Sequence, residues 1–146
     1  GIDSDNTIKI WQWRQGKLLA TVAGHTERIF DISFLGDRVV TCGVRHIRYW
    51  TLLGNTLEFR EGDFGKSEAQ TLLCIGKFAR QEPKEGFDDN DNLCFTGTIS
   101  GDIIIWKKNK LDRIISPAHS VCNEFSFLFF SNEIRLFISL GDDLFD

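Results

Sequence analysis

The 146-residue sequence contains no methionine, only two prolines and a single tyrosine. Lys and Arg (17) are fewer than Asp and Glu (21), which gives a net charge of −4 without a basic stripe, so we expect no nucleic-acid partner. The most apolar region, residues 125–140, is interrupted by Asn132, Glu133 and Arg135. A helix needs ~20 apolar residues to cross a bilayer, and we therefore expect no membrane partner.

The lack of methionine, with Gly1 falling in the middle of a strand pattern, leads us to expect a piece of a longer protein that opens without a signal-peptide leader. No C-x-x-C pair occurs, and the four cysteines are far apart: Cys42, Cys74, Cys94 and Cys122. This spacing predicts structural thiols in a reducing compartment rather than zinc ligands or disulfides. The absence of any N-x-[ST] acceptor agrees with a cytoplasmic protein.

The abundant residue types indicate many short strands, because the sequence has thirteen Phe, thirteen Gly and 42% hydrophobic residues. An internal repeat supports this interpretation, since three segments show apolar alternation towards a Trp: residues 6–11, 46–50 and 101–106. Trp11 and Trp50 are 39 residues apart, whereas Trp50 and Trp106 are 56 apart. The polar run at residues 80–92 explains the difference as an inserted loop.

The Gly24-His25 pair followed by a strand-borne Trp50 is the signature of a WD40 propeller blade. The sequence thus predicts an all-β fold, a partial WD40 β-propeller with about three blades' worth of four-stranded antiparallel sheets in an open arc. We expect the last two strands of one blade in residues 1–23, complete blades in 24–60 and 61–117, and in 118–146 either the start of a further blade or a divergent tail. A closed propeller has about four to eight blades, so the remaining blades of the same propeller are expected partners of the two open edges.

More than the generic repeat is recognisable, because the stretches at 7–13, 24–34, 40–55, 64–75 and 100–106 closely resemble the echinoderm microtubule-associated protein-like (EMAP-like) family. In that family the segment belongs to the first propeller, after the HELP motif. The resemblance implies a non-enzymatic protein of the cytoplasmic microtubule cytoskeleton whose propellers contact tubulin or act as a scaffold for other proteins. Members usually attach to microtubules through an N-terminal region outside this span. The alternative is a generic WD40 adaptor in another complex.

The WD40 resemblance also assigns structural positions. His25, Thr41 and Trp50 fall on a hydrogen-bond network in which a buried imidazole bridges a strand hydroxyl and the indole N–H. An Asp six residues before the Trp usually orients the imidazole, and that position is Val44 for Trp50. The corresponding positions in the other repeats are Asp5, Trp11, Trp106 and His119.

No constellation for catalysis, a cofactor or a metal is evident. The run GDFGKS at 62–67 lacks the glycine that a P-loop needs at position 60 and the catalytic loop of a kinase. The Asp-rich run at 88–92 lacks the Gly and Glu of an EF-hand loop. Because tubulin is acidic, the best candidates for partner contacts are the turn-proximal residues Arg45, His46 and Arg48. A second basic cluster at residues 107–110 is expected to keep its turn soluble.

Overall fold

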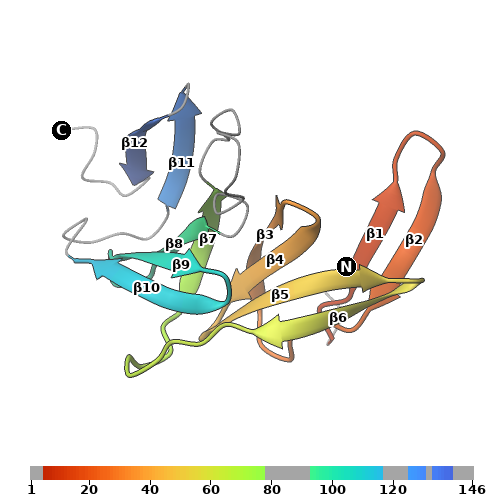
Figure 1. Cartoon of the computed structure of the whole chain (residues 1–146), viewed down its shortest axis with the longest axis horizontal. Coiled ribbons are helices and arrows are strands. Elements are labelled where there is room, and N and C mark those ends of the chain that lie inside the picture. Colours follow the sequence, from red (N-terminus) through yellow and green to blue (C-terminus); the bar gives the residue numbers. More distant parts are fainter. Residues whose placement is uncertain (1–4, 78–92, 117–124, 131–132, 140–146) are drawn as a thin grey trace, which may run out of the picture.

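The computed structural model describes residues 5–77, 93–116, 125–130 and 133–139, the last two ranges as backbone only (Figure 1). The described residues form strands, turns and loops, which confirms the all-β prediction. Within them, no helix is long and apolar enough to cross a membrane. The expected insertion at 80–92, with its Asp-rich run, lies outside the described residues, as do His119 and Cys122.

Twelve strands follow one another along the described chain. They are β1 (Ile8–Gln12), β2 (Lys17–Val22), β3 (Ile29–Leu35), β4 (Arg38–Gly43), β5 (His46–Leu53), β6 (Thr56–Glu61), β7 (Leu72–Lys77), β8 (Leu93–Thr98), β9 (Ile103–Lys107), β10 (Lys110–Ile115), β11 (Phe125–Phe130) and β12 (Glu133–Ser139). Short turns join many of them, and the turn residues Arg45 and Lys108 both have a φ of 58°. Strands β1, β5 and β9 lie on the three repeat segments predicted at residues 6–11, 46–50 and 101–106, where apolar residues alternate towards a Trp.

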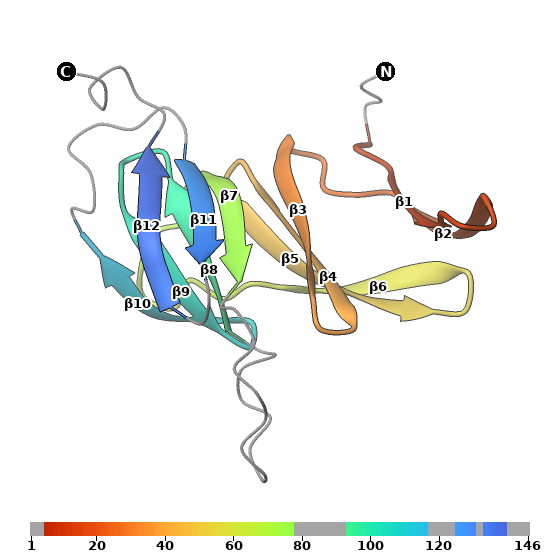
Figure 2. The same cartoon turned by 90° about the horizontal axis from the view of Figure 1, so that it is seen from above.

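The strands form four antiparallel sheets, each from neighbours in sequence. Two sheets have four strands, in the orders β3-β4-β5-β6 and β7-β8-β9-β10, and the pairs β1-β2 and β11-β12 form two-stranded sheets. Figures 1 and 2 show the four sheets in a row, with β1-β2 at one end and β11-β12 at the other. The structure is therefore an open arc of a β-propeller.

The sheets pack face to face through two apolar layers, because alternate residues of each strand point to opposite faces. Between the two four-stranded sheets, Val40, Ile47 and Tyr49 pack with Leu72 and Trp106. Between the β1-β2 sheet and β3-β6, the buried residues are Ile8, Ala20, Val39, Trp50 and Leu57. Trp50 and Trp106, the repeat tryptophans of the complete sheets, are both 0% exposed.

Polar contacts also join the two four-stranded sheets. Asp31 on β3 accepts the backbone N–H of Ile75 on β7 through Oδ2 at 2.8 Å. At the outer strands, Asn109 donates from Nδ2 to the carbonyl oxygen of Glu61 at 3.1 Å. These bonds satisfy polar groups at both ends of the apolar layer and hold the sheets in one relative position.

Candidate functional site

A Thr–Trp hydrogen bond lies at the same place in each complete sheet. Trp50 donates its indole N–H to Thr41 Oγ1 at 2.9 Å, and Trp106 donates to Thr96 Oγ1 at the same distance. In both sheets the Trp is on the third strand and the Thr on the second, and all four side chains are 0% exposed. The threonine hydroxyl therefore satisfies an indole N–H that burial has removed from water.

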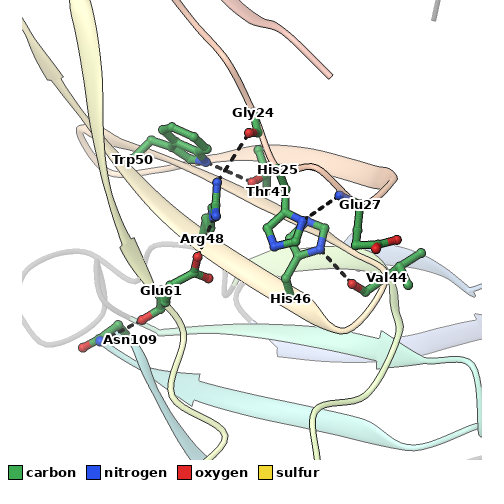
Figure 3. Close-up of polar contacts among 10 residues, drawn as sticks. All are labelled: Gly24, His25, Glu27, Thr41, Val44, His46, Arg48, Trp50, Glu61 and Asn109. Atoms are coloured by element: carbon green, nitrogen blue, oxygen red, sulfur yellow. Dashed lines mark hydrogen bonds and ion pairs between the residues drawn. The ribbon is translucent and has the colours of Figure 1, made fainter. Parts of the chain in front are cut away.

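His25 does not bridge the hydroxyl and the indole as expected. Its Nδ1 instead accepts the backbone N–H of Glu27 at 2.9 Å, and its ring lies on that of His46 (Figure 3). The prediction of a His–Thr–Trp network is thus corrected to a Thr–Trp pair and a separate histidine stack. The physical reason is local, because the turn at residues 25–27 offers a backbone donor to the imidazole.

The rings of His25 and His46 are parallel, with centroids 3.7 Å apart and an interplanar angle of 2°. His46 is 3% exposed, and its Nδ1 lies 2.9 Å from the carbonyl oxygen of Val44, so we assign the proton to Nδ1. Its Nε2 is then a bare acceptor, buried and without a hydrogen-bond partner. Because Nδ1 of His25 accepts the Glu27 N–H, the proton of the neutral His25 ring is assigned to Nε2.

Both imidazoles are held neutral by their surroundings. Burial is the main cause that lowers the pKa of His25 below 6.5, followed by the nearby Arg48 charge. Burial also lowers the pKa of His46, and His25 and Arg48 lower it further, although its bond to Val44 opposes this. The Glu61 carboxylate favours the charged form of both rings, and the Glu27 carboxylate favours the charged form of His25. Neither is strong enough to reverse the lowering of the two pKa values. The stack is thus a pair of neutral rings near pH 7.

Arg48 joins this polar cluster to the sheet. Its Nε donates to Glu61 Oε1 at 2.7 Å, and Nη1 reaches the carbonyl oxygen of Gly24 at 3.5 Å (Figure 3). The guanidinium also lies 3.9 Å from the ring centroid of Phe59 and 5.8 Å from that of Trp50. Arg48 is therefore bound within the fold, with a side chain that is 14% exposed.

The three expected partner contacts differ in accessibility. His46 is buried and Arg48 is paired with Glu61, whereas Arg45 is exposed in the turn between β4 and β5. The expectation that His46 touches a partner directly is corrected by its burial. The ring of His25 covers His46 at the start of β5, while the turn presents Arg45 to solvent.

The other repeat positions lie apart from the cluster. Asp5 accepts the N–H of Gly24 through its carbonyl oxygen at 2.9 Å, so its backbone makes the contact. Trp11 is 54% exposed, unlike Trp50 and Trp106, and its strand β1 is paired only with β2 among the described strands.

The described cysteines are free thiols in the core. Cys42, Cys74 and Cys94 are buried. Burial raises the pKa of Cys94 to about 11 and that of Cys74 to about 12, and it raises the pKa of Cys42 as well. Such thiols are poor nucleophiles at neutral pH because the thiolate is the reactive form.

The GDFGKS run is part of a loop between sheets. Asp63 accepts the N–H of Gly65 through Oδ1 at 2.8 Å, and Phe64 packs edge-to-face on Trp106 with centroids 5.1 Å apart. The local bonds of Asp63 and the packing of Phe64 account for these residues as structural. In the part of the chain that the structure describes, no three His, Cys, Asp or Glu side chains gather closely enough to hold a metal ion.

Sequence reasoning missed Thr96, Glu61 and Asp31. Thr96 precedes Trp106 by ten residues, as Thr41 precedes Trp50 by nine, so the internal repeat was a signal for it. Glu61 and Asp31 make contacts to Arg48 and Ile75 that depend on strand register and sheet packing.

Four-stranded sheets in a row, each with the same buried Thr–Trp pair, define a segment of a WD40-repeat β-propeller. Mouse echinoderm microtubule-associated protein-like 1 is 31% identical over 122 residues, 80% of this chain and 14% of that protein. The human counterpart of that protein is 30% identical, again over 80% of this chain and 14% of the relative. Human echinoderm microtubule-associated protein-like 2 is 28% identical over 80% of this chain and 17% of that protein. The chain belongs to the EMAP-like family and spans about a seventh of the length of the first of these relatives.

Two other comparisons add nothing to this assignment. The chain matches no protein-family model. The crystal structure of the computationally designed Ika8 protein aligns with a TM-score of 0.45 and 19% identity, over 86% of this chain and 48% of that one.

Proposed function

We propose that this chain is a non-enzymatic propeller segment of a microtubule-associated protein and that it binds tubulin or serves as a scaffold in the cytoplasmic cytoskeleton. The observation that carries the proposal is the 31% identity with mouse echinoderm microtubule-associated protein-like 1 over 122 residues. The match covers 80% of this chain, so the similarity extends well beyond one motif.

We also propose how the chain divides into blades. The β3–β6 sheet is the complete blade of residues 24–60, and β7–β10 is that of residues 61–117. The β1-β2 pair supplies the last two strands of a preceding blade within residues 1–23, and β11-β12 begins a further blade within 118–146. This division is supported by the matching Thr–Trp pairs of the two complete sheets.

Of the three candidate tubulin contacts, Arg45 is the one that the geometry favours most. Its guanidinium is exposed on a turn, whereas the charge of Arg48 is compensated by Glu61 and His46 is buried. A cation on a rigid turn between two buried strands can meet an acidic surface with little loss of conformational freedom.

Co-sedimentation with stabilised microtubules tests the proposal, with soluble tubulin examined in parallel by gel filtration. We expect the 146-residue chain to pellet with microtubules and Arg45→Glu to weaken binding. Lys108→Glu is a matched control, because Lys108 is also an exposed turn residue with a φ of 58° and undergoes the same change of charge. Equal losses for both variants would indicate non-specific electrostatics and remove Arg45 as the contact.

The alternative function is an adaptor that presents other proteins to a different complex. A folded chain that ignores both microtubules and soluble tubulin would contradict tubulin binding and favour this adaptor role. Circular dichroism of the same samples, showing the β-sheet spectrum, establishes that the chain was folded when it failed to bind.

A further inference from the structure

The outer edge of β6 lies on the rim of the propeller. β6 ends a complete four-stranded sheet, and β5 is its only hydrogen-bonded neighbour among the described strands (Figure 1). Because a propeller blade has four strands, further blades on either side of this sheet leave the edge of β6 free. This edge is therefore a surface of the protein whatever the number of blades.

The backbone groups of Leu57 and Phe59 point outwards from the β6 edge. Leu53 and Thr56 flank a two-residue turn, so they exchange backbone hydrogen bonds with each other, and pairs that do so recur at every second residue of the ladder. Leu57 and Phe59 fall between these positions. Their N–H and C=O groups consequently face away from β5.

The carbonyl oxygen of Glu61 supports this direction. Glu61 is two residues beyond Phe59, and its carbonyl oxygen accepts Nδ2 of Asn109 from the neighbouring sheet at 3.1 Å. Among the described residues, the outward backbone groups of Leu57 and Phe59 have no comparable partner. The middle of the β6 edge thus presents unpaired donors and acceptors, and such an edge can pair with another strand.

β6 is also more regular than the outer strands of the neighbouring sheets. The six residues Thr56–Glu61 pair with β5 without a break in register. In contrast, β2 skips Leu19 in its pairing with β1, and β10 skips Asp112 in its pairing with β9. Such bulges twist an edge away from a new partner. Of the three edges, that of β6 is the one in a geometry that can add a strand.

The side chains of β6 complement a second copy of the same strand. In an antiparallel pair of two β6 strands centred on Phe59, Glu58 of each copy lies opposite Arg60 of the other. Glu58 and Arg60 are both exposed, and neither has an ion-pair partner among the described residues. Unlike charges opposite each other stabilise a strand pair. The Phe59 side chain, now 49% exposed, meets its own counterpart at the centre.

We propose that the chain forms a dimer in which β6 pairs antiparallel with β6 of a second copy and joins two blades into one eight-stranded sheet. The two Phe59 residues exchange two backbone hydrogen bonds, and Leu57 pairs with Glu61 of the other copy. The Glu61 carbonyl oxygen keeps its bond from Asn109, because it has two lone pairs. One patch that binds itself closes with two-fold symmetry. The proposal does not rest on tubulin binding, and either can fail alone.

Sedimentation velocity of the 146-residue chain is the first test, with twice the mass of one chain expected. Glu58→Arg should return the protein to the mass of one chain, because two cations would then face each other on both sides of Phe59. Asp112→Arg is the matched control, since Asp112 is an exposed residue of the outer strand β10 and undergoes the same change of charge. This control should remain a dimer.

An exchange of charges tests the register. Arg60→Glu alone should also give the mass of one chain, because two carboxylates would face each other. When Glu58→Arg chains are mixed with Arg60→Glu chains, unlike charges meet again and a heterodimer should form. The double variant Glu58→Arg/Arg60→Glu should dimerise by itself. Circular dichroism of each variant, showing the β-sheet spectrum of the parent, establishes that the losses do not come from unfolding.

A disulfide tests the centre of the pair. Opposite residues that exchange backbone hydrogen bonds have Cα atoms about 5.5 Å apart, which is within the reach of a disulfide. In a Cys122→Ser background, Phe59→Cys should therefore form an inter-chain disulfide in air, and Asp112→Cys should not. A chain that stays monomeric would leave the edge to a segment of another protein and overturns the proposal. A dimer that ignores Glu58→Arg, or variants that mixing does not restore, overturn it as well.

Discussion

His25 and His46 lie face to face with their ring centroids 3.7 Å apart, one from the turn before β3 and the other from the start of β5. The rings hold these segments together only while both are neutral. Protonation of His25 at Nδ1 would remove the acceptor of the Glu27 N–H, and protonation of His46 would leave a buried Nε2–H without a partner.

The first prediction is a loss of stability in mild acid. Both histidines have a lowered pKa in the folded state, so the unfolded state binds more protons once the pH falls below the ordinary value of 6.5. The stabilisation is complete above 6.5 and is lost as the pH falls through the lowered pKa values. Urea unfolding at intervals from about pH 7.5 to about pH 5 measures this.

His46→Phe is the informative variant for this prediction. A phenyl ring can still stack on His25, and it has no proton to bind, so the loss of unfolding free energy in acid should be smaller than in the parent. An unchanged acid dependence would show that other groups are responsible.

The second prediction concerns the Thr41–Trp50 pair. Thr41→Val keeps the shape of the side chain but leaves a buried indole N–H unpaired, which should cost about 1–3 kcal/mol. Trp50→Ala should cost about 3–5 kcal/mol because it also empties a buried site. Thermal or urea unfolding measures both.

A double-mutant cycle tests the bond itself. In Trp50→Phe the N–H is absent, so adding Thr41→Val should cost less than it does in the parent. Additive losses would mean that the hydrogen bond contributes nothing beyond packing.

The third prediction separates the packing of Arg48 from its ion pair. Glu61 has a side chain that is 52% exposed, so Glu61→Gln should cost no more than about 1 kcal/mol. Arg48→Ala should cost more, about 1–2 kcal/mol, because it also removes the contacts with Phe59 and Trp50. Equal losses in urea unfolding would assign the effect to the ion pair alone.

The fourth prediction concerns Gly43 at the end of β4. A Cβ there would overlap the carbonyl oxygen of Arg28 and come within 2.8 Å of His46 Cε1. Because the main obstacle is backbone, Gly43→Ala should cost about 3 kcal/mol, the upper end of the overpacking range.

Gly54→Ala is the control, since a Cβ at Gly54 meets nothing within 4 Å and only its φ of 60° opposes the change. We expect a loss of about 1 kcal/mol for this variant. If Gly43→Ala is no more destabilising than Gly54→Ala, the close approach of β4 to Arg28 is not maintained in solution.

Local pattern was sufficient for the repeated strands, whereas resemblance supplied part of the site. Apolar alternation predicted the repeat segments 6–11, 46–50 and 101–106, on which β1, β5 and β9 lie, without information from the rest of the chain. The resemblance to WD40 repeats, rather than the strand pattern, selected Thr41 and Trp50 as members of one hydrogen-bond network.

The sequence by itself determined the all-β class and the repeated strands with their tryptophans, since these follow from apolar periodicities of two residues. Only the tertiary structure decided that His25 stacks on His46, that Arg48 pairs with Glu61 and that Trp11 is exposed. Each of these depends on which segments become neighbours when the sheets assemble. Periodicity along one strand contains no information about the partner that its side chains will meet.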